Sequence, residues 1–149
     1  MSEAKVPDGA LDWVRDHVRR YLATDGADGH MFSAGKMKPV PTLLLTTTGR
    51  KSGDRFIMPL IYGKAGDGYV VIASKGGAPD HPGWFLNLEA DPAVEVQVLA
   101  DRFPARARVA TGAERARLWD EMAAPFSPYE DYRQKAGREI PVVVLERVP

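Results

Sequence analysis

The sequence predicts an α+β fold in which about six mostly antiparallel strands build a curled sheet, with flanking helices at the start of the chain and between the later strands. Two observations carry this prediction. The turns between expected strands are short, as in GRKSGD and KAGDG, and such connections require antiparallel pairing. The runs VVI and VVVL are apolar without a break, which indicates strands covered on both faces, as in a closed barrel.

The N-terminal part of the chain, residues 1–24, is expected to be helical, and residues 41–149 are expected to form the barrel. Residues 8–23 have the helical period, with Asp8 as a candidate cap. The apolar side chains of this helix fall on one face: Leu11, Val14, Val18 and Leu22. Residues 24–40 are rich in glycine, which predicts an irregular segment.

Three strands are expected next, at residues 42–48, 55–62 and 68–74. The turn GRKSGD joins the first strand to the second. The sequence KAGDG, with Asp67-Gly68 at its tip, predicts a hairpin between the second strand and the third.

The second half of the chain is expected to alternate between helices and strands. Residues 83–90 predict a helix that Pro92 ends, followed by a strand pair in which VEVQV has the alternation of a half-buried strand. A helix then begins at a capping box formed by Thr111 and Glu114. The expected elements after Pro92 are strands at 94–99 and 102–110, a helix at 111–123, a short helix or turn at 129–136, and a strand at 141–148.

Composition excludes several classes of function. The 149 residues make one domain by length, residues 1–149, and 20 Lys and Arg balance 20 Asp and Glu, which argues against binding to nucleic-acid phosphates. There is no cysteine, and the three histidines lack the spacing of metal ligands, so a metal site is not expected. No signal peptide and no membrane-spanning run is expected, so a cytoplasmic location is the default.

The strongest candidate site is the turn that follows the first strand, in PTLLLTTTGRKSG. Arg50 and Lys51 are adjacent cations there, Ser52 follows them, and Arg55 adds a third cation just beyond. Cationic side chains and turn N–H groups at the end of a strand can hold a phosphate or a carboxylate. A solvent-exposed hairpin turn is the simpler interpretation of this segment by itself.

A second candidate is the segment SKGGAPDHPGWFLNL. Ser74 and Lys75 precede two glycines at a strand end, which lets a ligand approach the backbone, although a flexible loop explains this segment equally well. Asn87 is the one polar residue in the apolar run WFLNL of the expected helix. A buried amide needs hydrogen-bond partners, and a ligand ring with carbonyl and N–H edges would supply them.

Two tyrosines, Tyr129 and Tyr132, lie three residues apart on one side of the last expected helix. Packing on the barrel is the simpler interpretation. The functional alternative is a pair of phenols that line a substrate pocket and donate a hydrogen bond or a proton. No catalytic triad and no pair of carboxylates stands out, so the chemistry is expected to come from a cofactor.

Five segments, in order along the chain, resemble the deazaflavin-dependent nitroreductase family, which comprises split-barrel reductases that use coenzyme F-420, an 8-hydroxy-5-deazaflavin. The segments are DWVRDHVRRYLATDGADG, LLLTTTGRKSG, MPLIYG, VIASKGGAPDHPGWFLNLEADPAVEVQV and PYEDYRQKAGREIPVVVLE. The resemblance implies the FMN-binding-type split β-barrel. It also implies hydride transfer from the reduced deazaflavin to an electron-poor acceptor such as a quinone, an activated enone or a nitroaromatic.

The resemblance further implies roles for particular residues. The cofactor's phosphate and glutamate tail would be held by Arg50, Lys51, Ser52, Pro59 and Leu60. The deazaflavin ring would be lined by Ile72, Ala73, Ser74 and Lys75, with Gly83, Trp84, Phe85 and Asn87 across from it. The candidate catalytic hydroxyls, which would stabilise or protonate a developing oxyanion, are those of Tyr129, Tyr132 and Ser74.

One departure from the family concerns Arg55. Family members often carry a basic residue three positions before the proline of the PL pair, and here that position is Phe56. In a strand, a shift by one residue reverses the face of the side chain. Arg55 would therefore miss the cofactor tail unless a local bulge restores its direction.

Three alternatives stay open at this point. An FMN-dependent oxidoreductase on the same barrel would suit the same cationic turn, as would a non-catalytic module that carries a flavin-like or haem-like ligand. A third alternative is weak contact of the N-terminal helix with the inner face of a membrane, which would suit a menaquinone acceptor. Packing of this helix on the barrel is the simpler interpretation, because Asp12 and Asp16 dilute its basic face.

Overall fold

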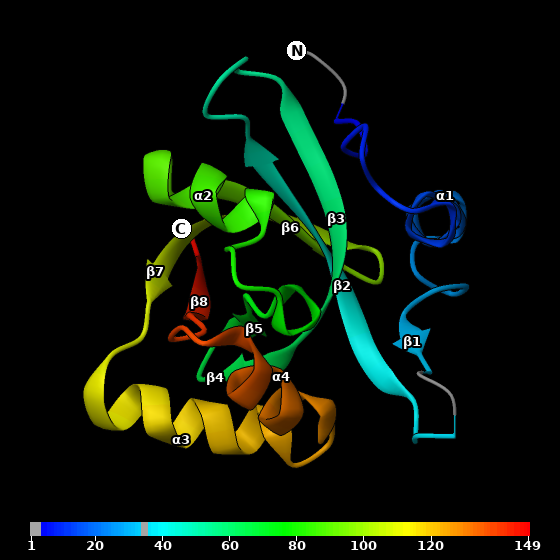
Figure 1. Cartoon of the computed structure of the whole chain (residues 1–149). Coiled ribbons are helices and arrows are strands. Elements are labelled where there is room, and N and C mark those ends of the chain that lie inside the picture. Colours follow the sequence, from blue (N-terminus) through cyan, green and yellow to red (C-terminus); the bar gives the residue numbers. More distant parts are fainter. Residues whose placement is uncertain (1–3, 34–35) are drawn as a thin grey trace.

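The computed structural model describes residues 4–33 and 36–149, which form a curled eight-stranded sheet flanked by helices (Figure 1). The strands are β1 (Met31–Phe32), β2 (Val40–Thr48), β3 (Arg55–Ile61), β4 (Gly63–Ala65), β5 (Gly68–Ile72), β6 (Ala93–Val98), β7 (Asp101–Val109) and β8 (Val142–Arg147). The helices are α1 (Asp12–Thr24), α2 (Gly83–Ala90), α3 (Gly112–Ala123) and α4 (Pro128–Ala136), with a 3-10 turn at Lys75–Gly77.

The strands pair in the order β1-β2-β6-β7-β8-β5-β4, and β3 pairs with β2. Every pair of strands is antiparallel, which confirms the expected α+β class. Residues 4–33 and 36–149 contain eight strands rather than about six, because β1 and β4 span only two and three residues and are too short to show a period. The expected hairpin partner of β5 was wrong: KAGDG joins β4 to β5, while β3 pairs with β2.

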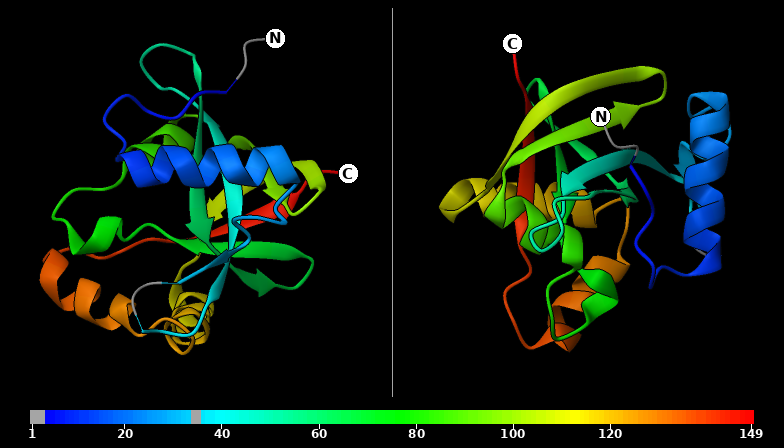
Figure 2. Two further views of the ribbon diagram at one scale, coloured as in Figure 1. Left: turned by 90° about the vertical axis from the view of Figure 1, so that its right-hand side faces the viewer. Right: turned by 90° about the horizontal axis from the view of Figure 1, so that it is seen from above.

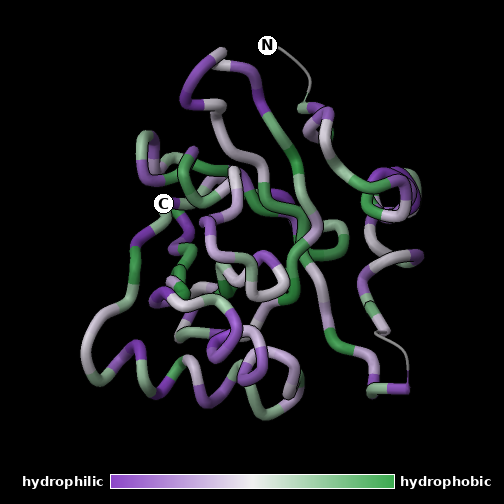
Figure 3. Tube along the Cα trace, in the orientation of Figure 1, coloured by the Kyte–Doolittle hydropathy of each residue, from purple (hydrophilic) through white to green (hydrophobic). Residues whose placement is uncertain are grey.

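The neighbouring strands β5 and β8 are covered on both faces, as their unbroken apolar runs predict. Val71 and Val143 belong to one hydrophobic cluster, together with residues of α2 and β6. Val70 and Val144 belong to a second cluster, which α3 and α4 cover. Hydrophobic residues accordingly concentrate along the strands, while α3 and α4 carry many hydrophilic ones (Figure 3).

Helix α1 lies across the opposite side of the sheet from α3 and α4 (Figure 2). It begins at Asp12 with Leu11 at the N-cap, so the expected capping by Asp8 is wrong. The buried face is also rotated from the expected one, because Leu11 and Leu22 are exposed. The residues that α1 buries are Val14, His17, Val18 and Tyr21. This face is favoured because the polar atoms of His17 and Tyr21 find backbone partners.

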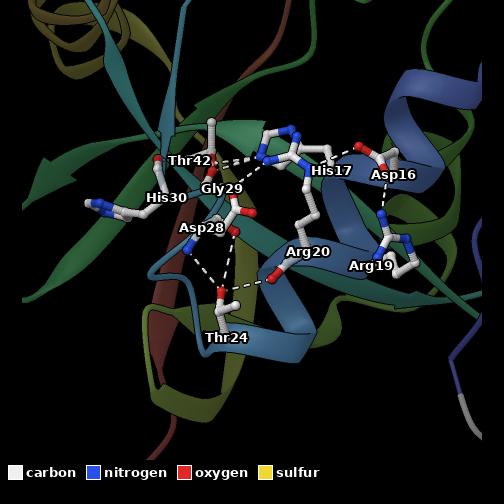
Figure 4. Close-up of polar contacts among 9 residues, drawn as sticks. All are labelled: Asp16, His17, Arg19, Arg20, Thr24, Asp28, Gly29, His30 and Thr42. Carbon is white, nitrogen blue, oxygen red and sulfur yellow. Dashed lines mark hydrogen bonds and ion pairs between the residues drawn. The ribbon is translucent and has the colours of Figure 1, made fainter.

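Polar contacts fasten the segment after α1 to strand β2 (Figure 4). The imidazole of His17 lies with Nε2 2.7 Å from the carbonyl oxygen of Gly29, and the hydroxyl of Thr42 donates to the same oxygen at 2.8 Å. On the outer side of the helix, Arg20 binds Asp16 and Asp28. The expected irregular segment at 24–40 therefore contains an anchored loop and strand β1, and its residues 34 and 35 lie outside the described residues.

The expected capping box of α3 does not form. Thr111 occupies the N-cap position, but its side chain makes no capping hydrogen bond. The carboxylate of Glu114 instead accepts two hydrogen bonds from Arg108 of β7, at 2.6 and 2.8 Å. A bidentate, charge-assisted pair is stronger than a bond to one backbone N–H, which explains why Glu114 turns toward the strand.

Candidate active site

A cleft of about 710 Å³ lies where the β2–β3 turn, the end of β5 and the starts of α2 and α4 meet. This volume is typical of sites for small molecules and cofactors. Most of the candidate residues line it: Arg50, Lys51, Ser52, Pro59, Leu60, Ile72, Ser74, Lys75, Gly83, Trp84, Asn87, Tyr129 and Tyr132. The chain therefore brings together two segments and a tyrosine pair that are far apart in sequence.

Ala73 and Phe85 are two candidate residues whose side chains do not line the cleft. Both pack in the hydrophobic core, with 0% and 3% of their surface exposed. Ala73 lies between Ile72 and Ser74 in extended chain, and side chains alternate there, so its neighbours face the cleft and it does not.

Three cations lie at the cleft: Arg50 and Lys51 in the β2–β3 turn, and Lys75 just after β5. None of them forms an ion pair with another described residue. No aspartate or glutamate is among the described residues that line the cleft. The local charge is therefore positive although the net charge of the chain is zero, which favours an anionic ligand.

The β2–β3 turn is held in one tight conformation. The N–H of Gly49 donates to the carbonyl of Asp54 at 2.7 Å, and the N–H of Gly53 donates to the carbonyl of Gly49 at 2.9 Å. A Cβ atom on Gly49 would lie 2.7 Å from the ring of Phe56, so only glycine fits at this close approach. The turn thus presents Arg50 and its neighbours to the cleft on a fixed frame.

Asn87 is buried as expected, but its amide finds partners within the protein rather than needing a ligand. Its Oδ1 accepts hydrogen bonds from the guanidinium of Arg50 at 2.9 Å and from the backbone N–H of Arg50 at 3.2 Å. Its Nδ2 donates to the hydroxyl of Thr47 at 3.2 Å. The argument that a ligand ring must satisfy this amide is therefore wrong, and Asn87 instead orients Arg50 from helix α2.

Arg55 points away from the cleft, as the one-residue shift predicts. The pairing of β3 with β2 is continuous from Arg55 opposite Thr48, so no bulge changes the direction of the side chain. Its guanidinium lies 3.5 Å from the carboxylate of Glu95, and Phe56 lines the cleft in its place. The expectation that Arg55 adds a third cation to the turn is therefore wrong.

The segment after β5 has an unusual backbone. Lys75, Gly76 and Gly77 all have positive φ angles, of 49°, 62° and 83°. Ser74 is buried, and both it and Lys75 line the cleft. This left-handed turn carries the chain sharply from the strand to the start of α2, and it exposes backbone close to the cleft.

Helix α4 provides the phenols of Tyr129 and Tyr132, whose rings pack edge to face with centroids 6.2 Å apart. Tyr129 is buried, and burial raises the pKa of its phenol well above the usual range, with a further contribution from Tyr132. Tyr129 therefore keeps its proton at neutral pH and can act as a donor but not as a base.

The sequence alone missed the opposite wall of the cleft, to which α1 and β1 contribute. The ring of Phe32 stacks on Trp13 with centroids 5.9 Å apart and on His17 at 6.1 Å. It was missed because Phe32 falls in the segment expected to be irregular. Two more lining residues, Phe56 and Met58, alternate with Ile57 on β3, and this period could have identified them.

The fold and the cleft together define a class of protein. A largely apolar cleft lined by cations without ion-pair partners among the described residues, held by a curled antiparallel sheet, fits an apolar ring system that carries an anionic tail. Among solved structures, an F420-H2 dependent reductase, FDR-A, is 40% identical to this chain, covers 71% of this chain and 94% of its own, and has a TM-score of 0.66. The class is that of the split-barrel reductases.

Two further comparisons narrow this class. The sequence profile described as F420H(2)-dependent quinone reductase matches residues 13–147. The F420H(2)-dependent quinone reductase Rv1261c of Mycobacterium tuberculosis is 40% identical over 137 residues, which cover 90% of this chain and 89% of that protein. The chain belongs to the F420H(2)-dependent quinone reductase family, and it is an oxidoreductase that uses coenzyme F-420.

A more distant neighbour shows how widely the fold is used. HutZ, a heme storage protein from Vibrio cholerae, has a TM-score of 0.58 and 18% identity, and the match covers 72% of this chain and 82% of HutZ. At this identity the likeness concerns the fold alone.

Proposed function

We propose that the whole chain works as one reductase domain that binds reduced coenzyme F-420 in the cleft and reduces a quinone there. The observation that carries this proposal is the combination of a largely apolar cleft with three unpaired cations, Arg50, Lys51 and Lys75, and no acidic lining residue among those described. An anionic tail at the cations and a planar ring in the cleft satisfy both features at once.

The roles of the lining residues follow from their positions. Arg50, Lys51 and Ser52 would hold the phosphate and glutamate tail, and Pro59 and Leu60 would support it from β3. The ring would lie against a wall formed by Ile72, Ser74 and Lys75 on one side and by Gly83, Trp84 and Asn87 on the other. Ala73 and Phe85 would support this wall from the core beneath it.

The bound cofactor supplies a hydride that is held on a carbon of its ring. The chain's own part is to hold ring and acceptor in contact and to exclude water from the cleft. Quinone reduction also needs a proton on the acceptor oxygen, and the hydroxyls of Tyr129, Tyr132 and Ser74 line the cleft. The tyrosine pair is the candidate for this donation because both phenols line the cleft. Burial raises the pKa of Tyr129, which favours its phenol as a hydrogen-bond donor to the oxygen but makes it a weaker acid. Activated enones and nitroaromatics are electron-poor acceptors of the same kind.

A titration tests the cofactor. The fluorescence of the three tryptophans is followed as oxidised coenzyme F-420 is added, with FMN as the comparison. Tight binding of the deazaflavin in preference to FMN is expected. Lys51→Glu should weaken that binding about tenfold or more, since about 1.4 kcal/mol is one decade in Kd. Arg117→Glu, an exposed charge reversal on α3, is the control. Preference for FMN, or binding of neither cofactor, would contradict the proposal.

A second experiment tests the proton donors. Tyr129→Phe and Tyr132→Phe keep the aromatic packing but remove the hydroxyls. We expect each variant to bind coenzyme F-420 normally and the double variant to reduce a soluble quinone about 100-fold more slowly, in line with loss of general acid catalysis. Unchanged turnover in both single variants and in the double variant would show that solvent supplies the proton.

We propose in addition that the mouth of the cleft rests weakly on a membrane surface, where lipid quinones are found. The supporting observation is the exposure of Leu11 (64%), Trp13 (55%) and Met31 (53%) around α1 and β1, with Trp13 also lining the cleft. None of the described helices has the length and apolar character needed to cross a membrane. When anionic vesicles are sedimented, the wild type should be found in the pellet with the vesicles, and the double variant Leu11→Glu/Met31→Glu should stay in the supernatant. Equal recovery of both in the supernatant would contradict this contact.

A further inference from the structure

Arg138, which lies on the short link between α4 and β8, makes an unusual set of contacts. Its guanidinium donates to the carbonyl oxygens of Ala78 at 3.1 Å, Ser74 at 3.2 Å and Ala73 at 3.4 Å. It also donates to Nδ1 of His81 at 3.1 Å. All four partners belong to residues 73–81, the segment that connects β5 to α2. One side chain, from a residue near the C-terminus, therefore makes hydrogen bonds along most of this connection.

This connection is the part of the cleft frame that most needs external support. Its left-handed turn at Lys75 includes a non-glycine residue with φ 49°, a conformation that L-residues adopt at an energetic cost. Its internal backbone bonds are few: the N–H of Gly77 donates to Ser74 at 2.9 Å, and the N–H of Ala78 donates to Lys75 at 3.1 Å. Without Arg138, the carbonyl of Ser74 would keep, among the described residues, only the N–H of Gly77, and the carbonyls of Ala73 and Ala78 would lose the guanidinium.

The same turn is packed directly against the helix that carries the two tyrosines (Figure 1). A Cβ atom on Gly77 would lie 2.9 Å from the Cα atom of Tyr132, so the two backbones touch with no side chain between them. Ser74, Lys75 and Tyr132 all line the cleft, so the position of the first two relative to Tyr132 depends on how the turn packs on α4. Arg138 follows the end of α4 by only two residues, so its bonds to the turn hold the turn in this packing against α4.

The chemistry of the contacts requires an arginine. Four acceptors that lie around one group can be reached by the five N–H donors of a planar guanidinium, whereas a lysine ammonium offers three donors from one point. Arg138 has no carboxylate within 4.0 Å among the described residues, so its charge is used for hydrogen bonds rather than for an ion pair. Burial lowers the pKa of this guanidinium, an effect that Asp80 opposes, and a guanidinium stays charged throughout the physiological range.

We infer that Arg138 is a positioning residue, whose guanidinium holds the Ser74–Lys75–Gly76 turn against α4 and thereby fixes where Ser74 and Lys75 lie in the cleft lining relative to Tyr132. No atom of Arg138 lines the cleft, so its effect on the reaction passes through the turn. The effect on cofactor binding rests on the proposed function, whereas the effect on the turn does not.

The test uses Arg138→Lys, which keeps the charge and much of the volume but cannot reach the four acceptors together. Arg117→Lys, at an exposed position on α3, is the matched control. Hydrogen exchange of the ligand-free proteins is measured first. We expect the amides of Gly77 and Ala78 to exchange at least about tenfold faster in Arg138→Lys, with β6, β7 and β8 unchanged, because local opening is governed by local contacts. Arg117→Lys should match the wild type.

Titration with coenzyme F-420 is the second measurement, and it should show weaker binding in Arg138→Lys by about tenfold or more, the loss expected for a misplaced wall. Wild-type exchange in the turn would overturn the inference. Faster exchange spread evenly over all strands would also overturn it, because Arg138 would then stabilise the fold in general. Faster exchange confined to the turn but with unchanged affinity would refute its role in the cleft. If the wild type itself does not bind the deazaflavin, the proposed function fails, while the exchange data still decide whether Arg138 holds the turn.

Discussion

Substitution of Asn87 by aspartate tests whether the orientation of Arg50 matters for an anionic cofactor. The amide oxygen of Asn87 accepts from the Arg50 guanidinium at 2.9 Å, so a carboxylate in the same place keeps the geometry and adds a negative charge. The hydroxyl of Thr47, which now accepts from Nδ2, can rotate to donate to the new oxygen. The fold should therefore tolerate Asn87→Asp, with a melting temperature close to that of the wild type.

The magnitude follows from the 2.9 Å separation. At this distance a carboxylate and a guanidinium attract each other by about 1.4 kcal/mol even in the dielectric of bulk water, and by more in the partly enclosed cleft. The new carboxylate satisfies Arg50 internally, so this energy is lost to the cofactor's anionic tail. About 1.4 kcal/mol is one decade in Kd, and we expect binding of coenzyme F-420 to weaken about tenfold or more.

The assay is fluorescence titration at two ionic strengths, with the deazaflavin ring system that lacks the phosphate and tail as a second ligand. Wild-type affinity for coenzyme F-420 should fall with added salt, and Asn87→Asp should show a smaller fall, since one charge contact is already lost. Affinity for the tail-free ring should fall less than affinity for coenzyme F-420, because Asn87 lines the wall beside the ring but Arg50 faces the tail. Ala90→Asp, at the exposed end of α2, adds the same charge away from the cleft and is the control. Equal affinity of Asn87→Asp and the wild type for coenzyme F-420 would refute the reasoning.

Two further predictions concern stability. Tyr21 is fully buried, and its hydroxyl donates to the carbonyl of Thr42 at 3.0 Å and accepts from the N–H of Leu99 at 2.9 Å. Tyr21→Phe removes both bonds and should lower the free energy of unfolding, measured in urea, by about 1–3 kcal/mol. An unchanged free energy of unfolding would mean that water replaces both bonds. Burial lowers the pKa of His30, whose Nε2 lies 2.9 Å from the hydroxyl of Tyr62. Because the unfolded chain then binds the proton more readily than the folded chain, neutral His30 makes its full contribution to the free energy of unfolding above about pH 6.5. That contribution is lost as the pH falls through the lower pKa of the folded state. His30→Gln should have a melting temperature that declines less between pH 7.5 and 5, and an equal decline would assign the effect to other groups.

The strands could be predicted from the sequence because their signals are local. The apolar runs of β5 and β8 reflect burial that each strand has by itself, and the structure confirms them. The alternation expected in β6 holds at Val94, Glu95 and Val96 but is wrong at Gln97, which is buried and donates to the carbonyl of Leu99. Helix α1 could be predicted as a helix but not in its orientation. Its buried face depends on His17 and Tyr21, whose polar atoms are satisfied by backbone groups of residues 29, 42 and 99, and no local pattern contains that information.

The candidate site divides in the same way. The cationic turn could be predicted because two adjacent cations between glycines directly follow an apolar strand. A shift by one residue in a strand was enough to predict that Arg55 points away from the cleft. The role of Asn87 was misjudged, since a sequence shows that a buried amide needs partners but not which partners it has. The sequence did not predict a role for Arg138, because an arginine next to a glycine is typical of a solvent-exposed turn.

The zero net charge of the chain is compatible with an anion site because acids and bases are distributed unequally over the fold. Arg108, Arg20 and Arg147 are satisfied by carboxylates on the outer surface, far in sequence from the β2–β3 turn. At the cleft the lining includes three cations and, among the described residues, no carboxylate. Ion pairs that are exposed to solvent contribute little to stability. Their main effect is to neutralise positive charge on the outer surface, so that positive charge without a partner remains at the cleft. The net charge of the whole chain argues against a nucleic-acid ligand, whereas the pairing of individual side chains is what indicates a small anionic cofactor.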